Sequence, residues 1–188
     1  MKKFILLSFS LLCFTTTQAQ FIKERAVEVS IGYGLTSPYD DVDVVGSGFY
    51  AQGEYVLTAF SWLDFRPYAG FIFTGESSNQ SLPEEFKSTA NAFLFGGKFR
   101  LTAPIPYIAP YLELGLGGSL GKFETITPFT NLSQSGLLLH IPFSIGLELG
   151  KDKRINLEFT YYYHNSVEQF SGAFALGFTI PLNSASSD

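Results

Sequence analysis

The chain has 188 residues, of which only 15% are charged while 16% are aromatic. Soluble globular domains carry about 25% charged residues, so this composition disfavours a disordered chain, a nucleic-acid-binding protein and an ordinary cytosolic enzyme. The length fits a single domain that buries its core without disulfides or metals.

Residues 1–19 have the composition of a secretory signal peptide. Two lysines precede an apolar run over residues 4–14, and Thr17 and Ala19 are the small residues expected before a cleavage site at Gln20. The run is too short for a transmembrane helix, which needs about 20 apolar residues. We therefore predict that this segment directs export and is then removed.

Cleavage would change both the charge and the cysteine content of the chain. It removes two lysines and leaves 10 basic against 17 acidic residues, a net charge of −7. It also removes Cys13, so the exported protein would form no disulfide. Lipid attachment at Cys13 is the alternative, although Leu12 is larger than the residue that usually precedes a lipidated cysteine.

Downstream of this segment, bulky apolar residues alternate with small or polar ones in eight stretches, and none of them has a helical period. The clearest stretch covers residues 137–149, where Ile141, Phe143 and Ile145 belong to an unbroken apolar row. The eight predicted strands cover residues 26–35, 48–58, 65–74, 89–101, 107–120, 137–149, 155–164 and 173–182.

The connections between these predicted strands alternate in length. The short turns are residues 59–64, 102–106 and 150–154. The long loops are residues 36–47, 75–88 and 121–136, followed by a brief last loop at 165–170. The acidic residues of the long loops are Asp40, Asp41, Asp43, Glu76, Glu84, Glu85 and Glu124. Short turns at one end and long loops at the other are typical of an outer-membrane β-barrel.

The second row of each strand indicates which row faces lipid. A water-facing row is rich in charged residues, whereas here it is mostly Gly, Ser, Ala and Thr, which fill a narrow barrel interior. The bulky row matches the roughly 9–11 residues of a membrane-spanning strand, and unpaired strand edges are not tolerated in lipid. We therefore predict an all-β fold: a closed eight-stranded antiparallel up-and-down transmembrane barrel over residues 20–182, followed by a polar tail over 183–188. A soluble secreted barrel with its apolar row inside is the alternative.

With its signal peptide, eight strands, short turns and acidic loops, the chain resembles the small outer-membrane β-barrel family typified by OmpX and the membrane domain of OmpA. The resemblance covers residues 20–182 and rests on this pattern. It implies a monomer in the outer membrane of a Gram-negative cell envelope, in contact with outer-membrane lipids and lipopolysaccharide and inserted by the barrel-assembly machinery. Such barrels usually end on an aromatic residue, whereas here Ile180 and Leu182 precede the polar tail.

Strand parity places eight charged residues in the barrel interior, close to the periplasmic ends of their strands. They are Glu28, Glu54, Arg66, Lys98, Arg100, Glu113, Glu148 and Glu158. Because unpaired buried charges are costly, we expect them to pair, with Lys98 or Arg100 beside Glu113 as the principal contact. The pattern favours a rigid ionic plug; a proton or ion path is the alternative, although an eight-stranded barrel is narrow.

Aromatic residues lie near both predicted membrane interfaces, as the aromatic belts of membrane proteins do. Phe60, Trp62 and Phe65 flank one short turn, and Tyr161 and Tyr163 lie near the opposite end of their strand.

The two histidines of the chain, His140 and His164, are both predicted to point inward. They face each other across the turn at 150–154 and would lie side by side near the extracellular mouth. Imidazole pairs bind zinc or copper when a further ligand is present, and Glu168 is the nearest candidate. A structural hydrogen bond is the simpler interpretation.

His164 and Ser166 are two residues apart and would project from one strand face, which suggests a second site. A histidine there could activate the serine hydroxyl. The pair is similar to the His-x-Ser of the outer-membrane lipid A deacylase family, in which a glutamate on the last strand orients the histidine. Here strand eight has no acidic residue, and Glu168 follows in the loop instead.

The sequence as a whole favours a structural or interaction barrel with acidic extracellular loops and a side-chain-filled interior. Two alternatives stay open, namely lipid A ester hydrolysis by His164 and Ser166, and a narrow or gated porin-like channel. Phosphate-binding glycine loops, zinc-finger spacings and basic patches are missing from the sequence. We therefore expect neither a cofactor nor a nucleic-acid partner.

Overall fold

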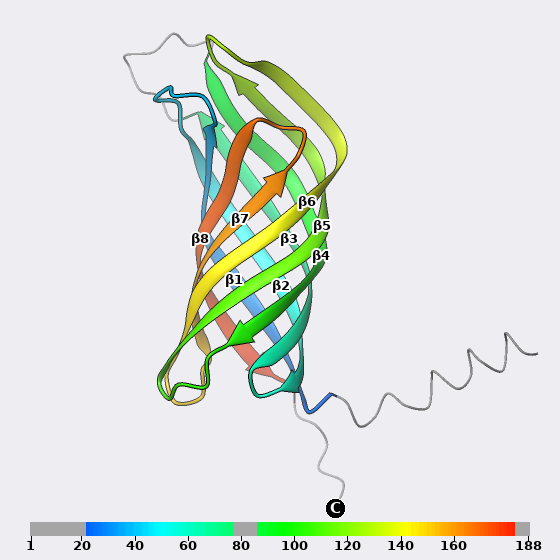
Figure 1. Ribbon diagram of the computed structural model, residues 1–188, viewed down its shortest axis with the longest axis vertical. Coiled ribbons are helices and arrows are strands. Elements are labelled where there is room, and N and C mark those ends of the chain that lie inside the picture. The colour runs from blue at the N-terminus through cyan, green and yellow to red at the C-terminus, as the bar shows by residue number, and fades with distance from the viewer. Residues whose placement is uncertain (1–21, 77–85, 183–188) are drawn as a thin grey trace, which may run out of the picture.

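The computed structural model describes residues 22–76 and 86–182, which form one closed barrel (Figure 1). Each strand pairs antiparallel with its neighbours in chain order, and β8 pairs with β1. The strands are β1 (Glu24–Pro38), β2 (Gly46–Phe60), β3 (Leu63–Glu76), β4 (Lys87–Thr102), β5 (Ile108–Ile126), β6 (Asn131–Leu149), β7 (Ile155–His164) and β8 (Gln169–Pro181). The prediction of a closed eight-stranded up-and-down barrel is confirmed.

Several sequence-based expectations fall on segments outside the described residues. They are the signal peptide with Cys13, the polar tail at 183–188, and the part of the second long loop that contains Glu84 and Glu85. Within the part of the chain that is described, no helix is long and apolar enough to cross a membrane.

The prediction of a long loop at 121–136 is wrong, because β5 and β6 continue through most of this segment. Both strands have 19 residues, and only residues 127–130 connect them. Outward positions beyond Leu120 carry polar residues such as Lys122, so the apolar alternation stops while the strand goes on. Glu124, expected in a loop, therefore lies on β5.

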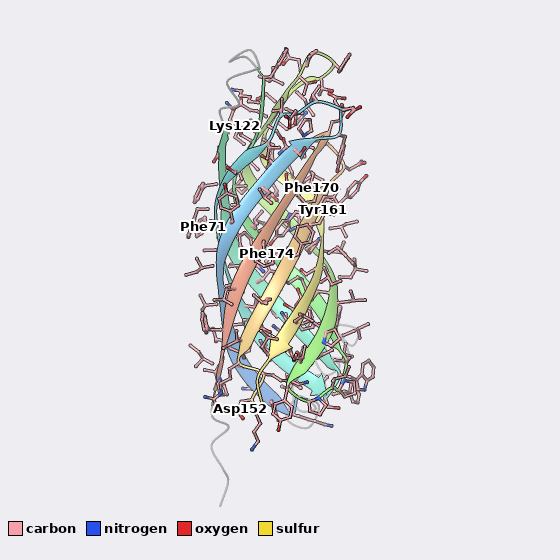
Figure 2. The ribbon with its side chains drawn as sticks, turned by 90° about the vertical axis from the view of Figure 1, so that its left-hand side faces the viewer. Phe71, Lys122, Asp152, Tyr161, Phe170 and Phe174 are labelled. Atoms are coloured by element: carbon pink, nitrogen blue, oxygen red, sulfur yellow. The ribbon has the colours of Figure 1, made fainter. Side chains whose placement is uncertain are left out.

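The outer surface of the barrel carries a broad apolar band. Its side chains point away from the interior and are widely exposed, Leu114 to 59% and Leu116 to 72%. Figure 2 shows Phe71 and Phe174 projecting from this band. Soluble monomers rarely expose a continuous apolar surface, whereas a barrel in a membrane places such a surface against lipid. The alternative of a soluble barrel with an apolar interior is therefore wrong.

A row of polar residues on β4, β5 and β6 marks one edge of the apolar band. Asn91, Lys122 and Ser135 lie in register across the three strands, each two residues beyond an outward apolar residue, which is Phe93, Leu120 or Leu137. The Lys122 ammonium lies 3.0 Å from a Glu124 oxygen, and Lys87 lies 3.4 Å from the other oxygen. The Lys122 hydrogen bond lowers the pKa of Glu124, as expected for a carboxylate in water beyond the band.

The five aromatic residues predicted at the interfaces lie toward the two ends of the apolar band. Phe60 and Trp62 stack with 5.6 Å between ring centroids next to the turn that joins β2 to β3, and Phe65 follows on β3. Tyr161 and Tyr163 lie at the opposite end, in edge contact at 6.4 Å. We call the first end, which has the short connections, the turn end, and the second the loop end.

Hydrogen bonds join the three described connections of the loop end. The Tyr39 amide donates to the Glu168 carbonyl (3.1 Å), and the Thr127 hydroxyl donates to an Asp40 carboxylate oxygen (2.6 Å). The connection at 39–45 is thereby tied to both the β5–β6 and the β7–β8 connections. Side chains of this first loop stabilise the mouth of the barrel.

Candidate functional site in the barrel interior

The interior at the turn end contains a cluster of ionisable side chains from seven strands. All eight charged residues predicted inside are there, and each is at most 8% exposed. Asp64 of β3 joins them through its contact with Arg66. We call these nine residues the ionic cluster. Because every strand except β8 contributes a charge, and Thr179 of β8 donates to Glu28 at 3.0 Å, the cluster ties the whole circumference together.

Arg100 is the centre of the ionic cluster. Its Nε lies 2.5 Å from Glu113, and its two terminal nitrogens lie 3.2–3.4 Å from Glu148, Glu28 and Glu158. The guanidinium also lies 3.7 Å from the centre of the Tyr111 ring. One planar cation thus binds carboxylates from β1, β5, β6 and β7. The guanidinium is suited to this role because it presents several N–H donors in a rigid arrangement.

Arg66 makes a second bridge across the cluster. It binds Glu28 at 2.8 Å, Glu54 at 3.1 Å and Asp64 at 3.1 Å. The sequence placed Asp64 in the turn at 59–64, but β3 begins at Leu63 and turns this carboxylate toward Arg66. Strand β3 begins two residues before the predicted strand, so counting alternate residues along the predicted strand did not include Asp64.

Lys98 completes the cluster from β4. Its ammonium lies 2.5 Å from Glu54 and 2.5 Å from Glu113. The expected partner Glu113 therefore lies between Lys98 and Arg100. In total, six carboxylates surround three fully buried cations, and Lys153 at the end of the barrel reaches one of them, Glu148, at 3.7 Å.

The two histidines lie side by side, as their register predicts, and Ser119 joins them. Their ring centroids are 5.4 Å apart. His164 Nδ1 lies 3.1 Å from the Tyr162 carbonyl, which can only accept, so Nδ1 carries the proton and Nε2 accepts from the Ser119 hydroxyl at 2.8 Å. His140 Nδ1 must then donate to Ser119 at 2.7 Å, and its Nε2 accepts from Tyr68 at 2.5 Å.

This chain of hydrogen bonds occupies all four ring nitrogens with protein groups. Neither His140 nor His164 therefore presents a free nitrogen to a metal shared with the other, and Glu168 lies exposed in the β7–β8 connection. The cross-strand pair Gly96 and Gly117 leaves room for the Tyr68 hydroxyl, because a Cβ on Gly117 would collide with it. The geometry matches the structural interpretation of the histidine pair.

Replacing Ser119 with alanine tests this hydrogen-bond chain. The change leaves His140 Nδ1–H and His164 Nε2 buried without a partner, which costs about 1–3 kcal/mol. We expect this loss in the free energy of unfolding, measured by urea titration in detergent micelles. Ser133→Ala, at an exposed position on β6, is the matched control and should change stability by less than about 0.5 kcal/mol. Equal stability of the two variants would contradict the assignment.

The structure gives no supporting contact for the predicted pairing of His164 with Ser166. Strand β7 ends at His164, so the alternation of side chains does not continue to Ser166, which lies exposed in the turn. The histidine nitrogens bind Ser119 and the Tyr162 carbonyl instead. Glu168 accepts a hydrogen bond from Thr130 at 3.4 Å. These three residues therefore do not form a nucleophile, a base and an orienting acid.

An apolar layer follows the histidines toward the loop end. Ile72, Leu94 and Phe123 are each at most 1% exposed and pack in one buried cluster. At the other end, a cavity of about 680 Å³ opens at the turn end and is lined by Arg66 and Glu148 of the ionic cluster. Water therefore reaches the edge of the cluster, while side chains fill the middle of the barrel.

Three further interior residues, which the sequence-based predictions did not name, lie on the same strand faces as the predicted interior charges. Tyr68 shares its strand face with Arg66, Ser119 shares its face with Glu113, and Tyr162 lies four residues from Glu158. Extending parity to uncharged polar residues would have found them. Parity alone gives no hydrogen-bond partners, because these depend on neighbours across the barrel.

Comparison with known proteins finds similarity in structure alone. No protein-family model matches the chain, and no curated protein matches it either. Neisserial surface protein A (NspA) superposes with a TM-score of 0.58 at 12% identity, covering 84% of this chain and 97% of that one. Ail of Yersinia pestis gives 0.49 at 16% identity, covering 85% and 100%. The outer membrane enzyme PagL gives 0.47 at 16% identity, covering 82% and 99%.

These identities support a shared fold and nothing finer. NspA covers nearly all of the barrel, and both chains close eight strands into one antiparallel sheet. Together with the apolar outer band, this comparison shows that the chain has the fold of the small eight-stranded outer-membrane β-barrels.

Proposed function

We propose that the protein is a monomeric structural and interaction barrel of the outer membrane, exported by residues 1–19 and inserted by the barrel-assembly machinery. The apolar band supports contact with outer-membrane lipids and lipopolysaccharide. In this proposal the turn end faces the periplasm and the loop end faces the outside, in line with the usual arrangement of such barrels.

The filled interior supports a closed rather than a conducting barrel. The ionic cluster, the histidine layer and the apolar layer of Ile72, Leu94 and Phe123 follow one another along the axis. We therefore expect no steady conductance in planar bilayers. The lipid A hydrolase alternative has no supporting contact, because His164 is bound to Ser119 and not to Ser166.

The observation that carries an interaction role is the long β5–β6 hairpin. Strand β6 pairs with β5 as far as Asn131, but with β7 only from His140 onward. Residues 131–139 therefore have a strand neighbour on one side within the described chain. Figure 1 shows this hairpin extending well past the β7–β8 turn at the loop end.

An unpaired strand edge is a template for another strand. Alternate residues of 131–139 point their backbone N–H and C=O groups away from β5, toward the side that β7 does not cover. Leu139 is 81% exposed and Leu137 63% exposed on the outer face, where they belong to the apolar band, so beyond the lipid an added strand would pair with residues 131–135. Gly136 of this edge has φ at +102°, a conformation that no other residue type adopts as easily. We propose that this edge binds extended polypeptide by strand addition.

A pair of synthetic peptides tests this role. The first is an eight-residue Thr/Val peptide, and the second is the same peptide with alternate amides N-methylated, which removes the donors of one edge. We expect the first peptide to bind the detergent-solubilised protein and to slow hydrogen exchange in residues 131–135, while residues 141–149 stay unchanged as an internal control. Equal binding of both peptides, or no protection at 131–135, would contradict edge pairing.

A further inference from the structure

Three carboxylates of the ionic cluster converge on one point. Glu54, Glu113 and Glu158 each present an oxygen, and these oxygens all lie within 4.8 Å of one another. All three residues are at most 3% exposed. Each comes from a different strand, β2, β5 and β7, so the barrel wall itself sets their spacing.

The Lys98 ammonium lies among these oxygens. It is 2.5 Å from Glu54, 2.5 Å from Glu113 and 3.9 Å from Glu158. The side chain is fully buried, and the ring centre of Tyr68 lies 5.5 Å from Nζ on another side. A compact cation surrounded by carboxylate oxygens has the arrangement of a metal ion in an oxygen-ligand site.

The contacts of Lys98 are those of a point charge rather than of a directed donor. Glu113 Oε2 and Lys98 Nζ are both buried, and neither makes a hydrogen bond of ordinary angle despite their short separation. The other oxygen of Glu113 is bound by Arg100 at 2.5 Å. Glu113 therefore directs its Oε2 toward Lys98 without an ordinary hydrogen bond, and this oxygen would be available to another cation at the position of the ammonium.

The ionic cluster around this site contains more carboxylates than buried cations. The ionic cluster holds six carboxylates and three buried cations, and Lys98 is one of the three. Removal of its charge would leave six carboxylates facing Arg66 and Arg100. Buried charge without compensation is strongly unfavourable, so the cluster would be neutralised either by protons or by another cation from solvent.

We propose that Glu54, Glu113 and Glu158 form a cation site in which the Lys98 ammonium is the resident cation, and which binds a hard divalent cation, Ca²⁺ or Mg²⁺, when that ammonium is removed. Both ions prefer carboxylate oxygens. A divalent ion would replace the single charge of Lys98 and offset one more carboxylate. The cavity at the turn end is lined by Arg66 and Glu148, which are neighbours of these three carboxylates in the ionic cluster, so an ion would enter from that end. This proposal does not depend on the interaction role of β6.

Replacing Lys98 with methionine tests the proposal, because methionine keeps most of the volume and loses the charge. The protein is extracted from membranes in detergent and titrated with Tb³⁺, a luminescent substitute for Ca²⁺. Tyr111, which donates to Glu158 at 3.1 Å, would sensitise an ion bound there. We expect K98M to bind Tb³⁺ at least about tenfold more tightly than the wild-type protein, and Ca²⁺ to displace it.

Two control variants separate this site from other acidic groups. Lys87→Met removes a lysine that binds Glu124 on the outer surface, and it should leave Tb³⁺ affinity at the wild-type value. The double variant with Lys98→Met and Glu158→Gln loses one ligand and should lose most of the gain. Equal Tb³⁺ affinity of K98M and the wild type, or of K98M and the double variant, would overturn the proposal.

A second measurement covers the case in which K98M does not accumulate as a folded barrel. Its refolding yield in micelles is then compared in millimolar CaCl₂, in millimolar MgCl₂ and in NaCl of matched ionic strength with EDTA. A yield restored by either divalent ion, with no such effect on the wild type, would support the site. A yield that is the same in all three solutions would overturn it.

Discussion

Arg100→Met is expected to lower the free energy of unfolding of the barrel by about 3–5 kcal/mol, the typical cost of breaking a buried ion pair by removing one partner. Arg100 is fully buried and binds Glu113, Glu28 and Glu158. Without it, these carboxylates stay inside a lipid-surrounded barrel with Arg66 and Lys98 as their remaining buried cations. Urea unfolding in detergent micelles, followed by tryptophan fluorescence, measures the loss.

Arg154→Met is the matched control for this effect. Arg154 forms its ion pair with Asp152 at 3.8 Å, and both side chains are more than 60% exposed in the turn that joins β6 to β7. Exposed pairs of this kind contribute about 0–1 kcal/mol. If the two arginine variants unfold at the same urea concentration, Arg100 is not the centre of the ionic cluster.

Leu114→Arg is expected to destabilise the membrane-inserted barrel by about 2–4 kcal/mol, the cost of an arginine at the middle of the lipid-facing surface. Leu114 is 59% exposed and lies midway between the turn end of β5 and the polar position Lys122. Unfolding in lipid vesicles measures this cost, since detergent would hide the dependence on depth.

Ser135→Arg is the control, because Ser135 points outward in register with Lys122 at the edge of the band. The same substitution there should cost about 0–1 kcal/mol. Equal costs at Leu114 and Ser135 would contradict the position of the apolar band.

Most of the fold follows from alternation along the strands. Residues that face lipid are apolar, and residues that face the narrow interior are small or polar. Alternation along each strand was therefore enough to predict that residues such as Glu28, Arg100 and Glu158 point inside. The facing of His140 and His164 followed from counting outward from the turn at 150–154, and their register agrees. Local patterns sufficed wherever one face of a strand meets lipid.

The same reasoning failed where strands leave the lipid. Beyond Leu120 the next outer residues of β5, Lys122 and Glu124, are polar, and a strand with polar residues outside and a mixed inner face resembles a loop in sequence. Ser166 was misplaced for a related reason, because nothing in the local pattern shows that β7 stops at His164. Strand ends outside the membrane depend on pairing with neighbours, which one segment of sequence does not contain.

The interior contacts required still more information. Glu113 had two expected cationic partners on β4, and the structure gives it both. The role of Ser119 between the histidines depends on the positions of β5, β6 and β7 together. Such contacts are set by the closure and radius of the barrel rather than by any single strand.

The most direct test of a lipid-facing apolar band is the accessibility of a spin label at Leu114. A cysteine at this position carries the label, the protein is reconstituted into lipid vesicles, and its collisions with oxygen and with a water-soluble nickel chelate are measured. We predict high access for oxygen and low access for the chelate at Leu114, with the reverse for a label at Ser135. Ready access of the chelate to a label at Leu114 would mean that this face lies in water, and it would contradict the membrane-spanning barrel.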